Sequence, residues 1–155
     1  MESKPAASRG LYLDDLRVGQ RFSSGTYQMD EHRMKAFAEE FDPQPFHLDE
    51  AAARASIFQG LAASGWHTAA ATMRLIVTGG LQLARGFIGV GGEITWSRPV
   101  RAGDTLRVES EIVEITESRS KPGQGIVKVR SVTLNQNDQD VQILIAKLLV
   151  FKRPA

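Results

Sequence analysis

The 155-residue sequence contains no cysteine. This absence excludes disulfides, thiolate metal sites and a cysteine nucleophile, and it is typical of proteins in a reducing compartment. No apolar run reaches the roughly 18 residues that a membrane span needs. The N-terminal residues, MESKPAASRG, lack the apolar core of a secretory signal. We therefore expect a cytoplasmic protein that does not enter a membrane.

Neither sign of charge dominates the sequence. Nineteen basic and eighteen acidic residues leave a formal net charge of +1, and no long run of either sign occurs. Binding to nucleic acid calls for a basic patch or stripe, so we expect no nucleic-acid partner. Hydrophobic residues make up 42% of the chain, which is enough to bury a core. We expect a disordered lead over residues 1–10 and a single domain over residues 11–155.

The first third of the chain predicts a strand followed by helices. Residues 21–29 are compatible with a strand, and Asp30 can cap a helix that continues through Phe41. Pro43 disfavours helical geometry at the residue before it, so this helix should end there. A short further helix is expected over residues 49–55.

Residues 64–80, SGWHTAAATMRLIVTGG, predict a longer helix of unusual composition. Ser64 can serve as its N-cap, and Gly79 with Gly80 can end it. Arg74 is its only charge, and apolar residues occupy nearly its whole circumference. Because a helix that is apolar all round is normally buried, we predict that this one is covered on every side.

From Glu93 onward the sequence has the character of β-strands. Turn-like segments separate four stretches rich in β-branched residues: GEITWSRPV, TLRVESEIVEI, IVKVRSVTL and VQILIAKLLVF. They predict a four-stranded antiparallel meander, to which the strand at residues 21–29 can pair. Residues 89–92, GVGG, precede a strand and not a helix, so they predict a turn or bulge rather than a nucleotide loop. A long buried helix beside one antiparallel sheet indicates an α+β fold in which the sheet curls around the helix.

Residues 42–47, DPQPFH, resemble the D-x-N-P-x-H signature of the MaoC-like dehydratases, which include the (R)-specific enoyl-CoA hydratases. Gly65 at the start of the predicted long helix agrees, and residues 99–106, PVRAGDTL, are similar to the family's turn between strands. The resemblance covers residues 13–151 and implies the hot-dog fold, a curled antiparallel sheet around a central helix. The sequence departs from the family at three positions, where the family commonly has Gly, Asn and His respectively: Phe41, Gln44 and Ser64.

The resemblance also implies a reaction, the reversible hydration of a 2-enoyl thioester to a 3-hydroxyacyl thioester. In it His47 takes a proton from water, while Asp42 orients the water and supplies a proton to Cα. The backbone N–H of Gly65, at the positive end of a helix, is the expected donor to the thioester oxygen. Further candidates for contact with substrate are Ser64, Gln44 and Trp66. The expected partners are an acyl-CoA or other acyl thioester and a second copy of the chain, with no cofactor beyond substrate coenzyme A and no metal.

The Asp42/His47 spacing has a physical interpretation of its own. Five residues place two side chains on opposite faces of a strand and well apart around a helix, so only a shaped loop can bring this pair together. Prolines at residues 43 and 45 stiffen that loop. A histidine titrates near working pH, about 6.5, whereas an aspartate near 3.9 needs burial to act as an acid. Candidate residues for the apolar surroundings are Phe41, Phe46, Phe58 and Trp66.

Several of these residues also fit simpler structural roles. Asp42 can be a helix cap without a catalytic role, and His47 can be a core histidine bonded to the backbone. For His67 we expect a structural role, and for His32 a position in solvent. The three histidines have no zinc-site spacing. A hot-dog thioesterase is the nearest alternative activity, although no Asp or Glu lies between Glu50 and Glu93 to serve as its helix-borne carboxylate. A non-catalytic acyl-binding protein is the alternative from another class.

Overall fold

The computed structural model describes residues 10–155, so the lead expected over residues 1–10 lies outside the described residues except for Gly10. In chain order the elements are η1 (Leu13–Asp15), β1 (Arg21–Gln28), α1 (Glu31–Phe41), α2 (Pro45–Leu48), α3 (Glu50–Arg54), α4 (Gly65–Gly79), β2 (Ile88–Trp96), β3 (Thr105–Glu117), β4 (Gln124–Leu134) and β5 (Asp140–Phe151). The predicted helix ends are confirmed, because Asp30 accepts a hydrogen bond from the Arg33 N–H and Ser64 caps α4.

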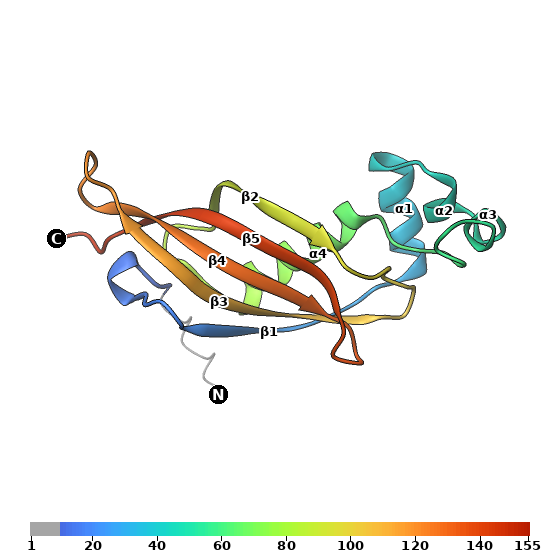
Figure 1. Ribbon diagram of the computed structural model, residues 1–155, viewed down its shortest axis with the longest axis horizontal. Helices are drawn as coiled ribbons and strands as arrows, with labels where there is room; N and C mark the ends of the chain where they lie inside the picture. The colour runs from blue at the N-terminus through green and yellow to red at the C-terminus, as the bar shows by residue number, and fades with distance from the viewer. Residues whose placement is uncertain (1–9) are drawn as a thin grey trace, which may run out of the picture.

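Within the described residues, one curled antiparallel sheet of five strands has the order β1-β3-β4-β5-β2 (Figure 1). Strands β3, β4 and β5 form the expected meander, and β1 pairs with β3. The predicted four-stranded meander is wrong at β2, which pairs with β5 at the opposite edge. The physical reason is that β1 occupies the free edge of β3, while the connection over residues 97–104 takes the chain across the end of the sheet.

Strand β2 is an edge strand with little cover. The register shifts between Gly89 and Gly91 where β2 pairs with β5, which confirms the irregularity expected at residues 89–92 as a bulge. Side chains on both faces of β2 are exposed, apart from the half-buried Ile94. The outer edge of β2 and both faces of the sheet at this strand are therefore open to solvent.

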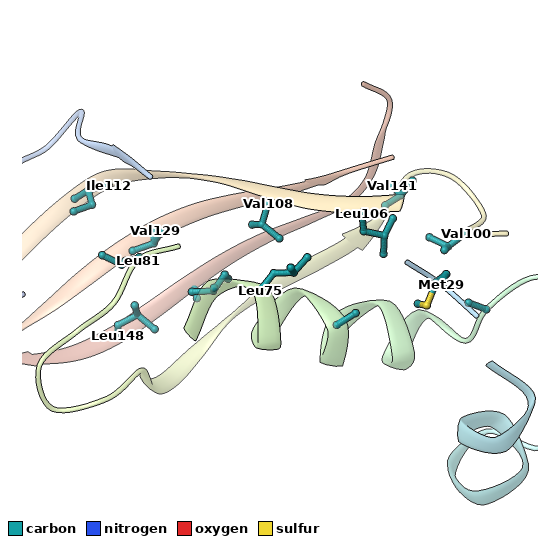
Figure 2. Packing of buried hydrophobic residues seen from close by; sticks show 14 of the residues in the cluster. Met29, Leu75, Leu81, Val100, Leu106, Val108, Ile112, Val129, Val141 and Leu148 are labelled. Carbon is teal, nitrogen blue, oxygen red and sulfur yellow. The ribbon is translucent and has the colours of Figure 1, made fainter. Parts of the chain in front are cut away.

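The core lies between the sheet and one side of α4. Alternate residues of β3 and β4 are buried, as expected for strands with one face against a core. Figure 2 shows Leu75 of α4 beneath the sheet face that carries Val108, Val129 and Leu148. Ile76, next to Leu75, has no exposed surface. This packing confirms the sheet-around-helix arrangement of an α+β hot-dog fold.

The prediction that α4 is covered on every side is wrong. Trp66, Met73 and Val77 lie on a face of α4 that remains 58%, 36% and 44% exposed respectively. A single sheet can cover only one side of a helix, and α1, α2 and α3 gather beyond one end of the sheet instead of over this face (Figure 1). No helix among residues 10–155 is long and apolar enough to cross a membrane.

The two sides of α4 should differ sharply in their sensitivity to substitution. Ile76→Ala removes fully buried methyl groups and should lower the free energy of unfolding by about 2–5 kcal/mol. The matched change Thr78→Ala, on the exposed side, should alter it by about 0.5 kcal/mol or less. Urea denaturation of both variants measures these differences, and equal losses would contradict the assignment of the buried face.

Candidate active site

A hollow with a volume of about 420 Å³ opens at the N-terminal end of α4. It lies where the end of α1, the short helix α2, the start of α4 and the end of β2 meet. Its lining residues are Asp42, Gln44, Phe46, His47, Phe58, Ala63, Gly65, Trp66, Thr68, Trp96, Ser97, Arg98, Pro99 and Val100. Five of the six site residues expected from the sequence line this hollow, and Ser64 lies directly behind it.

Asp42 and His47 meet because the chain turns sharply after α1. Asp42 is the C-cap of α1, and its backbone N–H donates to the Ala38 carbonyl at 2.8 Å. The Gln44 N–H then donates to the Asp42 carbonyl at 2.7 Å, and Pro45 occupies the first position of α2. His47 therefore lies on a one-turn helix and not on the loop expected. Its Nε2 lies 3.2 Å from Asp42 Oδ2.

The buried ring of His47 has a fixed orientation. Its Nδ1 lies 2.7 Å from the Ala62 carbonyl oxygen, which can only accept, so Nδ1 carries a hydrogen. Nε2 then faces a carboxylate oxygen, and two bare acceptors repel at that distance. The pair is favourable when one proton lies between Nε2 and Asp42 Oδ2, so the two residues form a one-proton unit.

Two neutral donors surround the Asp42 carboxylate. Ser64 Oγ donates to Oδ2 at 2.7 Å and Gln44 Nε2 donates to Oδ1 at 2.5 Å. Burial is the largest single influence on the pKa of Asp42 and raises it, but the hydrogen bonds from Ser64 and Gln44 and the charge of His47 together lower the pKa below its usual value. The expectation that burial raises this pKa is therefore wrong, because the donors outweigh desolvation.

The first turn of α4 connects the carboxylate to a free backbone donor. Ser64 is fully buried, and its Oγ also accepts from the Trp66 N–H at 3.3 Å, so its hydroxyl serves Asp42 and the helix cap rather than the hollow. Gly65 lines the hollow, and its N–H, in the first turn of α4, has no acceptor among residues 10–155. A Cβ on Gly65 would lie 2.6 Å from the Trp96 ring, so only glycine fits here.

The apolar wall of the hollow differs in one member from the expected set. Phe46, Phe58 and Trp66 line it, and the Phe46 ring packs edge-on against His47 with 4.6 Å between centroids. Phe41 does not line it, because the last turn of α1 directs its ring toward Phe37 and leaves it 64% exposed.

Two residues that the sequence did not single out shape the site. Trp96 forms a wall from the end of β2. Arg101 donates from its guanidinium to the carbonyls of Phe58, Gly60 and Leu61, and so ties down the loop that carries Phe58. Arg101 stands in the PVRAGDTL segment, which marked a turn between strands, but nothing in that segment indicates contact with a loop about 40 residues earlier.

The other histidines do not join the site. His67 is buried, stacks on Phe37 with 4.7 Å between ring centroids and has no partner for Nδ1 within the described residues. Burial and the nearby charge of Arg33 lower its pKa, which keeps the ring neutral. His32 is exposed. In residues 10–155 no three His, Asp or Glu side chains are grouped in a way that could hold a metal ion.

A curled antiparallel sheet around a central helix, with an Asp/His pair at the N-terminal end of that helix, defines a hot-dog-fold protein. Comparison with known proteins specifies the family. The family model described as MaoC like domain matches residues 16–135. The chain therefore belongs to the MaoC-like dehydratase family, as the resemblance at residues 42–47 indicated.

Individual relatives agree with this assignment. A MaoC-like dehydratase from Rhodospirillum rubrum is 57% identical, with a TM-score of 0.93 over 94% of this chain and 100% of that one. The R-hydratase PhaJ1 from Pseudomonas aeruginosa is 27% identical, with a TM-score of 0.73 over 93% of this chain and 88% of its own. The uncharacterized protein YdeM of Bacillus subtilis (strain 168) is 32% identical over 139 residues, which make up 84% of this chain and 92% of YdeM.

Removal of the Ser64 hydroxyl tests the electrostatic description of the pair. In Ser64→Ala the carboxylate loses a donor, so the pKa of Asp42 should rise, while loss of the cap should lower stability by about 1 kcal/mol. NMR titration of the Asp42 carboxyl carbon measures the pKa. Ser64→Thr keeps the hydroxyl and should stay close to the parent protein, and a pKa that does not rise in Ser64→Ala would contradict the assigned role.

Proposed function

We propose that this protein reversibly hydrates the double bond of a 2-enoyl thioester and forms a 3-hydroxyacyl thioester. The observation that carries the proposal is the joint position of the Asp42/His47 pair and the unpaired Gly65 N–H in one largely apolar hollow. The pair supplies acid and base at a single point, and the N–H supplies a donor for the thioester oxygen. The R-hydratase PhaJ1, among the similar structures, supports the same reaction type.

Asp42 and His47 each carry out one proton transfer in the hydration. The reactive arrangement is the one in which the shared proton is on Asp42, and it is the less populated arrangement because the pKa of Asp42 is lowered. Neutral His47 then accepts a proton from water at Nε2 while the water oxygen bonds to Cβ of the substrate. Asp42 gives its proton to Cα, so one hydrogen and one hydroxyl have been added across the double bond. His47 is then protonated and Asp42 ionised, and a proton transfer between Nε2 and Oδ2, 3.2 Å apart, restores the starting arrangement.

The Gly65 N–H acts on the other end of the substrate. As water bonds to Cβ, negative charge moves to the thioester oxygen, and a donor at a helix N-terminus stabilises it. Because glycine is the only residue that fits against the Trp96 ring at this position, the substrate carbonyl can approach the backbone closely.

Removal of either titrating group should abolish most of the hydration. Asp42→Asn and His47→Gln should each lower the turnover of a short 2-enoyl-CoA by about 10²-fold or more. Because the residues form one unit, the double variant should be little worse than the poorer single variant. Absorbance of the enoyl thioester measures hydration, and thermal melting shows that each variant is folded.

The same assay decides between the proposed function and its alternatives. Folded variants with near-normal hydration would overturn the roles of Asp42 and His47. Release of a free thiol by the parent protein, without hydration, would identify a thioesterase. Binding of acyl-CoA with neither reaction would identify a non-catalytic acyl-binding protein.

We also propose that the protein is a symmetric homodimer, with β2 of each copy at the interface. An edge strand exposes unpaired N–H and C=O groups, and β2 has no cover on its outer edge among the described residues. The exposed large apolar residues on α4 and β2 are Trp66, Met73, Val77, Ile88, Val90 and Trp96. A two-fold axis would bury this surface against itself, close to the mouth of the active-site hollow.

Sedimentation at micromolar concentration should therefore show a dimer. Val90→Lys brings like charges together across a two-fold axis and should weaken association by about tenfold or more. The control is Val113→Lys, an exposed position on β3, which should leave the dimer intact. A parent protein that sediments as a monomer would exclude this assembly.

A further inference from the structure

We infer that the Thr68 hydroxyl is a second hydrogen-bond donor to the thioester oxygen, beside the backbone N–H of Gly65. This inference rests on the proposed function, because it assumes that a thioester binds in the hollow at the N-terminal end of α4. It assigns a contact with the reacting atoms to a residue outside both the DPQPFH segment and the cap of α4.

Thr68 brings an unpaired hydroxyl to the hollow. The residue is only 1% exposed, and it lines the hollow. Its backbone N–H donates to the Ser64 carbonyl at 3.1 Å, but its hydroxyl makes no hydrogen bond within residues 10–155. A threonine in a helix can donate to the carbonyl four residues back, as Thr78 does to Arg74 at 2.5 Å. The Thr68 hydroxyl is therefore left for water or for a ligand.

Three hydroxyl side chains follow one another at helical spacing along α4 and its cap: Ser64, Thr68 and Thr72. The outer two are bonded within the protein. Ser64 donates to Asp42 at 2.7 Å, and Thr72 accepts from Gln142 at 3.0 Å. Of the three, Thr68 alone lines the hollow. A hydrocarbon chain against this hydroxyl would leave it unsatisfied, so a ligand that excludes water should place a polar atom there.

Thr68 lies on the same face of α4 as Gly65, one turn further along the helix. A helical side chain leans toward the turn on its N-terminal side, so Thr68 extends toward Gly65. Gly65 has no side chain to cover the hydroxyl, and both residues line the hollow. The hydroxyl and the Gly65 N–H therefore border the same part of the hollow. A carbonyl oxygen has two lone pairs, so it can accept from both donors at once.

The thioester oxygen is the substrate atom that suits this place. It is the only oxygen in the acyl part of a 2-enoyl thioester, and it can accept a hydrogen bond but cannot donate one. The other polar atom of the reaction, the new 3-hydroxyl, forms at the Asp42/His47 pair. A ligand oxygen that binds the Gly65 N–H is therefore the partner that the Thr68 hydroxyl lacks.

The charge that develops during hydration makes this contact catalytic. When the water oxygen bonds to Cβ, electrons of the double bond move toward the carbonyl, and its oxygen gains negative charge. The Thr68 hydroxyl keeps its proton throughout, and its hydrogen bond strengthens as the charge grows. Ala63, Trp96 and Val100 also line the hollow, and such apolar surroundings strengthen the electrostatic interaction. The contact should therefore lower the barrier more than it tightens substrate binding.

Turnover of 2-butenoyl-CoA tests the catalytic contact. Thr68→Val replaces the hydroxyl by a methyl group of similar size and should lower kcat on the order of 10²-fold, with a much smaller change in KM. Thr68→Ser keeps a hydroxyl and should lose far less kcat than Thr68→Val. The matched control is Thr78→Val, the same change at an exposed position of α4 outside the hollow lining, which should leave both parameters unchanged.

Infrared spectra of bound butanoyl-CoA, isotopically labelled at its carbonyl, test the contact without turnover, because this saturated thioester cannot be hydrated. Each donor weakens the C=O bond, so the carbonyl band should move to lower frequency when the thioester binds the parent protein. In Thr68→Val the band should move part of the way back toward its position in the free thioester. In Thr68→Ser it should stay near the parent position, whereas a merely structural role for Thr68 would not move the band in any variant.

Thermal melting shows which variants are folded, and Thr68→Ala, which removes the same hydroxyl, should agree with Thr68→Val in both measurements. A carbonyl band that is unchanged in these variants, a loss confined to KM, or a parent protein that does not shift the band would each overturn the inference. If the parent protein shifts the band of butanoyl-CoA but does not hydrate 2-butenoyl-CoA, the proposed function fails. The spectra then still decide whether Thr68 contacts the carbonyl.

Discussion

His47 can face Asp42 with only one of its ring nitrogens, because the carbonyl of Ala62 accepts a hydrogen bond from the other. This constraint determines the chemistry of the hollow. With Nδ1 committed, Nε2 and Asp42 Oδ2 share one proton, and the donors Ser64 and Gln44 keep the carboxylate a weak base. Asp42 and His47 are therefore one unit that shares a proton.

The N-terminus of α4 connects this unit to the rest of the protein. Ser64 caps the helix and donates to Asp42, and the next residue, Gly65, lines the same hollow with an N–H that has no acceptor within residues 10–155. The positions of the Asp42/His47 pair and of the Gly65 N–H thus depend on the position of one helix end. Leu75 and Ile76 hold that helix against the sheet, so core packing more than two turns away sets the geometry of the site.

The sheet contributes the opposite wall through Trp96. A buried polar chain from Trp96 through Gln142 to Thr72 joins β2, β5 and α4, and each link is satisfied by a partner. Such a chain is favourable only when all its members are paired, so it resists rearrangement. Arg101 acts similarly on the loop that carries Phe58, with three carbonyl acceptors. The hollow is therefore rigid on both sides of the pair.

Local chemistry in the sequence determined the helix ends at Asp30, Pro43 and Ser64 and the meander of β3 to β5, because caps, prolines and strand periodicity act over a few residues. The DPQPFH segment likewise identified the Asp/His pair and the family. Only tertiary structure decided which edge β2 joins, that one face of α4 stays open, and that the pKa of Asp42 falls. It also decided the contacts of Trp96 with Gln142 and of Arg101 with the Phe58 loop. These features depend on residues far apart in the chain, and no local pattern records which of them will meet.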